Sequence, residues 1–163
     1  MNFMDFMDLA LAEAQKAYDL DEVPVGAVIV KDGEVIAKAY NMKETKKIST
    51  AHAEILAIEE ASRAIGNWRL NGCDMYVTLE PCAMCAAAIA HSRISNLYIG
   101  TFNIDMGACG TILNILDYNI FNHKINTIWC YDNRCSDILT SFFKNRRKNN
   151  KIERSWLCES YCF

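Results

Sequence analysis

A pair of cysteines three residues apart, Cys82 and Cys85, stands in the stretch TLEPCAMCAAAIAHSR at positions 78–93. The alanine-rich run predicts a helix, and Pro81 suits its first position because an N–H group there would have no helical partner. Both thiols then lie on one face of the first turn, where free N–H groups and the helix dipole favour thiolates. On its own, the pair is compatible with a metal site, a redox pair or small side chains that fill a core.

A histidine and a glutamate in the segment TAHAEILAI narrow these alternatives. His52 stands in the first turn of a second expected helix, and two helices that flank one sheet can bring their N-termini to the same edge. One imidazole and two thiolates make a three-ligand tetrahedral zinc site with a fourth position open for water, as in catalytic zinc sites. Glu54 lies about 200° around the helix from His52, so we expect it to exchange protons with that water. Taken singly, His52 could cap or pack, and Glu54 could be a first-turn acid favoured by the dipole.

Strands and helices alternate along the chain, whose 163 residues are the length of one domain. A hairpin with a tight turn at Asp32-Gly33 comes early, and Gly66 is expected to end the helix that Ser49 or Thr50 caps. This order predicts an α/β fold, a three-layer α/β/α sandwich with a central mixed five-stranded sheet. We expect a single domain over residues 1–150 and a C-terminal tail over residues 151–163. The expected strands are 25–30, 34–40, 74–79, 96–100 and 125–131, and the expected helices are 3–18, 51–65, 81–92, 111–116 and 136–150, with a polar loop at 41–50.

The charge of the chain is unevenly distributed. Its formal net charge of −3 argues against indiscriminate binding to polyanions. Six of the seventeen basic residues nevertheless fall between positions 144 and 154, where Glu153 is the single acid. This asymmetry indicates either a local anionic partner or a solvated helix end whose cations complement the dipole. The N-terminal segment lacks the basic region of a signal peptide and its acids would interrupt a membrane span, so we expect a cytoplasmic protein without a membrane partner.

The motif H-x-E followed by P-C-x-x-C is the signature of zinc deaminases. The chain resembles the cytidine deaminase-like zinc deaminases, and within them the bacterial TadA-type tRNA adenosine deaminases. The segments that carry the resemblance are EVPVGAVIV, TAHAEILAI, NWRL, YVTLEPCAMCAAAI, GACGT and SFFKNRR. The resemblance implies a cytidine deaminase-like fold, one zinc ion per subunit held by His52, Cys82 and Cys85, and Glu54 as the proton carrier.

The same resemblance implies the reaction and the residues that serve it. The reaction is hydrolytic deamination of adenosine to inosine at the wobble position of a tRNA anticodon, with attack at C6 of adenine and loss of ammonia. Loop nucleotides are already partly unstacked, so extruding one costs less than from a duplex. The anticodon stem-loop of tRNA is therefore the expected partner, and the family forms homodimers. The substrate-binding residues that it implies are Asn41, Val25, Leu79, Ala83 and Asn103, and the RNA-contacting residues are Lys144, Arg146, Arg147 and His123.

The chain departs from the family pattern after Gly100. Asn103 and Asp105 stand where family members usually carry aspartate and lysine. The acid at the first of these positions faces the ribose of the flipped nucleotide. Asparagine can still bond a 2′-hydroxyl but repels a phosphate less, so we expect weaker discrimination between RNA and DNA.

Two other functions remain open from the sequence. A deaminase of a free base, nucleoside or nucleotide, such as guanine, cytidine or deoxycytidylate, would share every zinc-site residue; release of ammonia without tRNA would identify it. A zinc-stabilised RNA-binding module without catalysis is the second alternative. Glu54 argues against that module, because binding alone requires no proton carrier.

Overall fold

A mixed five-stranded sheet forms the centre of the computed structural model, which describes residues 3–118 and 123–159. The strands are β1 (Gly26–Lys31), β2 (Glu34–Tyr40), β3 (Cys73–Leu79), β4 (Asn96–Thr101) and β5 (Asn126–Trp129). Their order in the sheet is β2-β1-β3-β4-β5, with β1 antiparallel to both of its neighbours and β3, β4 and β5 parallel. The predicted mixed sheet is confirmed.

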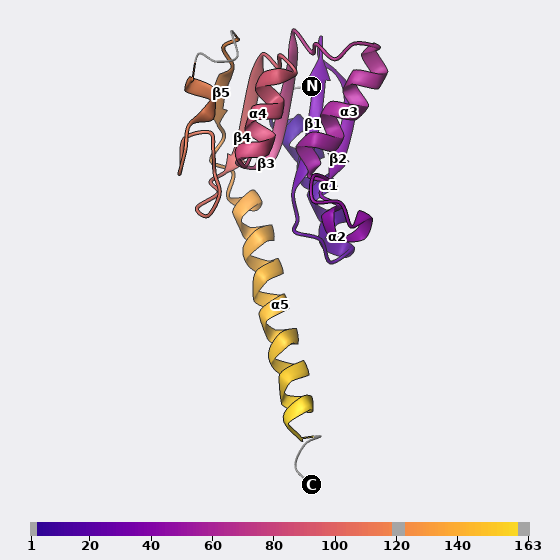
Figure 1. Cartoon of the computed structure of the whole chain (residues 1–163), viewed down its shortest axis with the longest axis vertical. Helices are drawn as coiled ribbons and strands as arrows, with labels where there is room; N and C mark the ends of the chain where they lie inside the picture. Colours follow the sequence, from indigo (N-terminus) through magenta and orange to yellow (C-terminus); the bar gives the residue numbers. More distant parts are fainter. Residues whose placement is uncertain (1–2, 119–122, 160–163) are drawn as a thin grey trace.

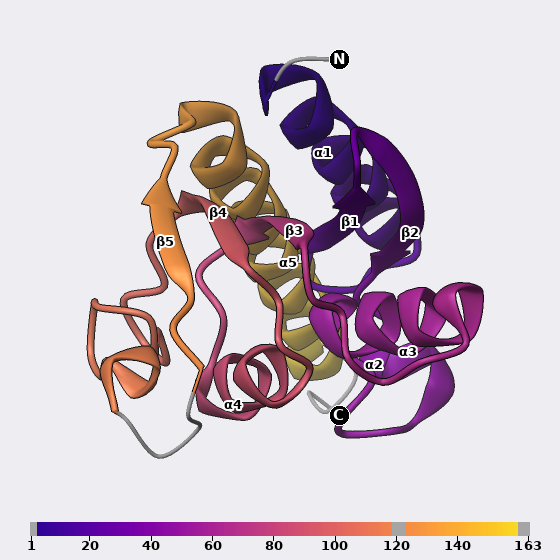
Figure 2. The same ribbon diagram turned by 90° about the horizontal axis from the view of Figure 1, so that it is seen from above.

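Two pairs of helices cover the two faces of this sheet (Figures 1 and 2). The first face carries α1 (Phe3–Asp19) and α5 (Asn133–Glu159), and the second carries α3 (Ala53–Ile65) and α4 (Ala83–His91). Side chains alternate along β1 accordingly: Val28 and Val30 pack under α1, whereas Ala27 and Ile29 pack under α3 and α4. Both faces of the sheet are therefore buried, and the predicted three-layer α/β/α sandwich is confirmed.

The two helices of the motif begin later than the sequence suggested. His52 is the N-cap of α3 and Cys82 is the N-cap of α4, each with an extended backbone and without a side-chain capping bond. The expectation that Ser49 or Thr50 caps α3 is therefore wrong, and Pro81 precedes α4 instead of occupying its first position. An N-cap residue keeps extended dihedral angles, so its side chain can project from the helix end. Gly66 does end α3, in the left-handed conformation.

Three other segments differ from the expected boundaries. The polar loop at 41–50 contains a short helix, α2 (Lys43–Lys46), and the expected helix at 111–116 is reduced to the 3₁₀ turn η1 (Ile115–Asp117). Helix α5 continues past residue 150 to Glu159 and extends away from the sheet (Figure 1). The rest of the expected tail, residues 160–163, lies outside the described residues. Within residues 3–118 and 123–159, we find no helix with the length and apolar character of a membrane span.

Candidate active site

The N-termini of α3 and α4 meet and bring three potential metal ligands together. The Nδ1 atom of His52 lies 3.8 Å from Sγ of Cys82 and 3.6 Å from Sγ of Cys85, and the ligand atoms all lie within 4.8 Å of one another. A tetrahedral zinc ion with its usual bond lengths separates nitrogen and sulfur ligands by about 3.6 Å. The arrangement and the donor types therefore fit one zinc ion held by three protein ligands.

The protonation equilibria of these ligands depend on one another. A hydrogen bond from the Cys85 thiol lowers the pKa of Cys82 to about 4, and the contact with His52 acts in the same direction. The same contact with Cys82, together with burial, raises the pKa of Cys85. The hydrogen bond to Cys82 raises the pKa of His52. Ionisation of Cys82 and protonation of His52 therefore favour each other, and binding of a metal to the cluster would displace protons from it.

Glu54 lies on the first turn of α3, next to this cluster. Its side chain is buried, with 4% of the residue surface exposed, and it lines the same cavity as His52 and Cys82. Burial raises the pKa of the Glu54 carboxyl. A raised pKa makes a carboxyl a better proton acceptor than an ordinary carboxylate, which suits a group that takes up and returns protons in catalysis.

A cavity of about 850 Å³ opens over the cluster, a size within the usual range of ligand pockets. One wall comes from the residues just before β1 and just after β2, and a second comes from the end of β4 and the residues that follow it. Helix α5 closes a third side. The lining side chains are Val23, Val25, Asn41, Lys43, His52, Ala53, Glu54, Leu79, Glu80, Cys82, Thr101, Phe102, Asn103, Ile104, Asp105, Met106, Ser136, Leu139, Thr140, Phe143 and Arg147.

Four of the five substrate-binding residues implied by the resemblance line this cavity: Val25, Asn41, Leu79 and Asn103. Asn41 is held in place because its amide nitrogen donates to the carbonyl of Val23 at 3.2 Å and to Oε2 of Glu22 at 3.4 Å.

Ala83 is the exception among the five. It is exposed at the start of α4, and its side chain is not part of the lining. The contact expected from its backbone amide stays a prediction.

The side chain of Asn103 stabilises its own loop. Its Oδ1 accepts the N–H groups of Asp105 at 3.3 Å and Met106 at 3.0 Å, while its Nδ2 donates to the carbonyl of Glu80 at 3.4 Å. An aspartate at this position could accept the first two bonds but could not donate the third. The asparagine therefore adds a hydrogen bond between its loop and the residue that follows β3.

The residues proposed to contact RNA occupy different places. Arg147 lines the cavity and Lys144 is exposed on the same helix. The guanidinium group of Arg146 lies over the ring of Phe142, and its Nη2 atom is 3.9 Å from Oδ2 of Asp21. The Nε2 atom of His123 donates to the carbonyl of Ile94 at 2.7 Å. Ile94 precedes β4, whereas the cavity lies beyond the other end of that strand. The RNA contacts of all four residues stay predictions.

Sequence reasoning missed part of the cavity. Thr101, Phe102, Ile104 and Met106 form the wall after β4, and α5 contributes Ser136, Leu139 and Thr140. These side chains carry no charge and follow no period, so nothing in the sequence placed them at the site. The acid in TLEPC, Glu80, was the available signal, because an acid between a buried strand and a metal-ligand segment requires partners.

Known proteins are similar to this chain in both sequence and fold. The sequence model of the MafB19-like deaminases matches residues 1–147. A tRNA-specific adenosine deaminase of Bacillus subtilis is 44% identical over 155 residues, which cover 94% of this chain and 96% of that protein. A tRNA-specific adenosine deaminase of Aquifex aeolicus is 44% identical over 144 residues, which cover 88% and 95%.

Solved structures extend the comparison to three dimensions. One comes from studies of A-to-I editing by tRNA:A34 deaminases at the wobble position of transfer RNA. It matches with a TM-score of 0.81 and 43% identity over 83% of this chain and 99% of that one. The guanine deaminase of Bacillus subtilis matches with a TM-score of 0.60 and 30% identity over 72% and 86% of the two chains.

Proposed function

Since the chain belongs to the family of tRNA-specific adenosine deaminases, we propose that its cavity takes the wobble adenosine of a tRNA anticodon loop beside a zinc ion. The enzyme converts adenosine to inosine in tRNA. The observation that carries the assignment to this cavity is the convergence of His52, Cys82 and Cys85 beside the buried carboxyl of Glu54.

His52, Cys82 and Cys85 would hold zinc, a Lewis acid that makes water a nucleophile near neutral pH. The remaining steps belong to the side chains of the chain itself. Glu54 would take the proton of the attacking water and pass it to N1 of the adenine ring. The same carboxylate would then take the proton of the hydroxyl group newly formed on C6 and deliver it to the amino group, so that ammonia leaves and the C6 carbonyl of inosine forms. Val25 and Leu79 would bury the faces of the base, and Asn41 would hydrogen-bond to its edge.

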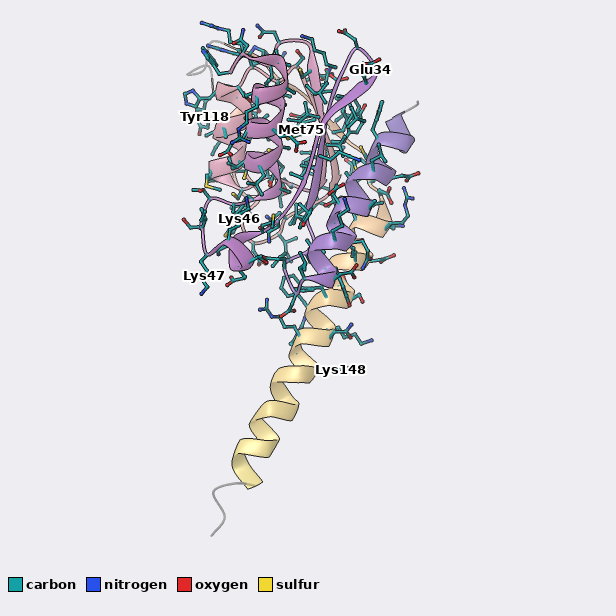
Figure 3. The ribbon with its side chains drawn as sticks, turned by 90° about the vertical axis from the view of Figure 1, so that its right-hand side faces the viewer. Glu34, Lys46, Lys47, Met75, Tyr118 and Lys148 are labelled. Atoms are coloured by element: carbon teal, nitrogen blue, oxygen red, sulfur yellow. The ribbon has the colours of Figure 1, made fainter. Side chains whose placement is uncertain are left out.

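Basic residues near the cavity support an RNA substrate over a free base. Lys43 and Arg147 line the cavity itself. Figure 3 shows Lys46 and Lys47 at the end of the sandwich from which α5 extends, with Lys148 farther along that helix. A free base carries no phosphate, whereas an RNA loop would place several within reach of such cations.

The direct test is incubation of the zinc-loaded protein with an anticodon stem-loop RNA, followed by nucleoside analysis at the wobble position. We expect inosine there and little ammonia from guanine, cytidine or deoxycytidylate. Rapid ammonia release from one of these small substrates, with the RNA unchanged, would reassign the enzyme. A matched DNA stem-loop in the same assay tests whether Asn103 weakens the discrimination between RNA and DNA; an Asn103→Asp variant with the same RNA-to-DNA ratio would end that proposal.

A homodimer is also part of the proposal. Apolar side chains are exposed on the segment from Ile104, which is 77% exposed, to Tyr118, and they include Met106, Ile112 and Leu113. Large apolar side chains that are exposed along one segment are a common feature of protein interfaces. Light scattering of the purified chain should give the mass of two copies, and a mass of one copy at micromolar concentration would contradict the dimer. A tRNA substrate would place the enzyme in the cytoplasm.

A further inference from the structure

The carboxylate of Glu80 is buried beside the metal-ligand cluster and accepts backbone hydrogen bonds from one segment. Only 1% of the residue surface is exposed. Its Oε2 accepts the N–H of Asn103 at 3.1 Å, and its Oε1 accepts those of Cys109 and Thr111, both at 3.0 Å. Hydrogen bonds from backbone amides to a carboxylate are among the strong ones in proteins. All three donors belong to residues 102–111, which we call the 102–111 loop.

The 102–111 loop forms the cavity wall that follows β4, through residues 102–106. Backbone contacts tie the same loop to the residues around Glu80. The N–H of Glu80 donates to the carbonyl of Thr101 at 2.9 Å, and the N–H of Ala108 donates to that of Pro81 at 2.9 Å. Cys82 also pairs with Gly107 in a short antiparallel bridge. One network therefore joins the cavity wall to a residue of the metal-ligand cluster, with Glu80 at its centre.

The packing at Gly107 shows how closely the loop fits this carboxylate. A Cβ atom built on Gly107 would collide with the carboxyl group of Glu80 and would lie 2.5 Å from the carbonyl oxygen of Asn103. The backbone of Gly107 is not in the left-handed region, so the need for glycine arises from space alone. The loop and the carboxylate are thus in direct contact.

We propose that Glu80 is a positioning residue of the deaminase. Its carboxylate fixes the wall at 102–106 relative to His52, Cys82 and Glu54, so that the adenosine is held against the reacting groups. This inference rests on the proposed function, because it assumes that the cavity takes the nucleoside.

A carboxylate, and not an amide, is needed because both of its oxygens accept bonds. In Glu80→Gln, an amide oxygen at the Oε1 position would keep two donors, and the NH₂ group would face the N–H of Asn103. The substitution preserves volume and should release the wall at Asn103 first. Glu13→Gln is the matched control, since Glu13 is also buried, on α1, and contacts Lys16 away from the cavity.

The experiment compares the full-length zinc-loaded wild type, Glu80→Gln and Glu13→Gln. It measures bound zinc, amide hydrogen exchange, and kcat and KM for the anticodon stem-loop RNA, with rates normalised to bound zinc. We expect Glu80→Gln to retain zinc, to exchange the amides of 103–106 faster, and to lose roughly tenfold to a hundredfold in kcat/KM. Glu13→Gln should match the wild type in all three measurements.

Two results would overturn the proposal. In the first, Glu80→Gln has wild-type exchange and wild-type kcat/KM. In the second, its activity falls only in proportion to the folded, zinc-bound fraction, which is what a purely structural role predicts. If Glu80→Gln fails to fold, exchange in the wild type still decides, because unprotected amides at Asn103, Cys109 and Thr111 would contradict the network. A wild type that forms no inosine would refute the proposed function, while the exchange data would still test the network.

Discussion

The Nδ1 atom of His52 lies 3.6 Å from Sγ of Cys85, although 33 positions separate the two residues in the chain. The contact exists because α3 and α4 cover the same face of the sheet (Figure 2). They follow β2 and β3, which run in the same direction, so both helices begin at the same end of the sheet. Each helix contributes its N-cap residue, and α4 adds one residue of its first turn. The sandwich thereby brings three potential metal ligands together from two helix starts.

Removing one ligand should remove the metal. Cys85→Ala leaves two ligands, too few for a stable zinc site, so bound zinc should fall from about one per chain to near zero. Because a bound metal stabilises the folded state by mass action, the Tm should fall as well. Atomic absorption and thermal melts measure both effects. Cys73→Ala, which removes an equally buried thiol in β3, should keep its zinc; full zinc content in Cys85→Ala would contradict the ligand assignment.

Replacing the proton carrier should separate binding from catalysis. Glu54→Gln preserves the shape of the side chain but cannot accept a proton, so kcat should fall by about 10²- to 10⁴-fold. Zinc content and affinity for the RNA should remain near those of the wild type, which metal analysis and fluorescence anisotropy would show. Glu59→Gln is the control on the exposed face of α3, where Glu59 pairs with Arg63. Unchanged inosine formation by Glu54→Gln would rule out its role.

The sequence-based reasoning succeeded where the chemistry depends on residue type and spacing. H-x-E and P-C-x-x-C predicted that His52, Cys82 and Cys85 would come together, and the alternation of strands and helices predicted the layers. It failed at the helix starts, because the extended backbone of His52 and Cys82 is fixed by the fold and not by the propensity of Ser49 or Pro81. The cavity wall at 102–106 depends on a contact between Glu80 and Asn103, which lie just beyond the ends of the parallel strands β3 and β4. No local pattern encodes such a contact.

The stability of the cavity wall after β2, which contains Asn41 and Lys43, should depend on pH through Glu22. Burial alone would raise the pKa of Glu22, but the N–H groups of Thr45, at 2.6 Å, and Glu44, at 3.1 Å, lower it below its ordinary value of 4.5. A carboxyl with a lowered pKa stabilises the folded state above its unfolded-state pKa and loses that contribution as the pH falls through the folded-state value. Glu22→Gln should therefore reduce the free energy of unfolding at neutral pH by about 1–3 kcal/mol.

The difference in the free energy of unfolding between Glu22→Gln and the wild type should shrink at pH values well below 4.5, because the carboxyl is then protonated in both states. Denaturant melts at neutral and acidic pH measure it. Glu34→Gln is the control, since Glu34 is exposed on β2 (Figure 3). A difference that stays constant down to acidic pH would show that the Glu22 carboxylate does not hold α2.

Arg147 should contribute to RNA affinity through phosphate contact. Arg147→Ala should weaken binding of the anticodon stem-loop RNA. It should also make the slope of log affinity against log salt shallower by about 0.7–0.9, the change expected for one lost phosphate contact. Fluorescence anisotropy at several salt concentrations measures both quantities. Arg63→Ala, on the exposed face of α3, is the matched control. An unchanged salt slope in Arg147→Ala would place the phosphates elsewhere.

Zinc titration into metal-free protein tests the central claim most directly, with bound zinc and wobble inosine measured in the same samples. The ligand geometry predicts that inosine formation rises in proportion to bound zinc and stops rising at about one ion per chain. Full inosine formation without zinc, or none from folded protein that holds one ion per chain, would contradict a catalytic zinc site at His52, Cys82 and Cys85.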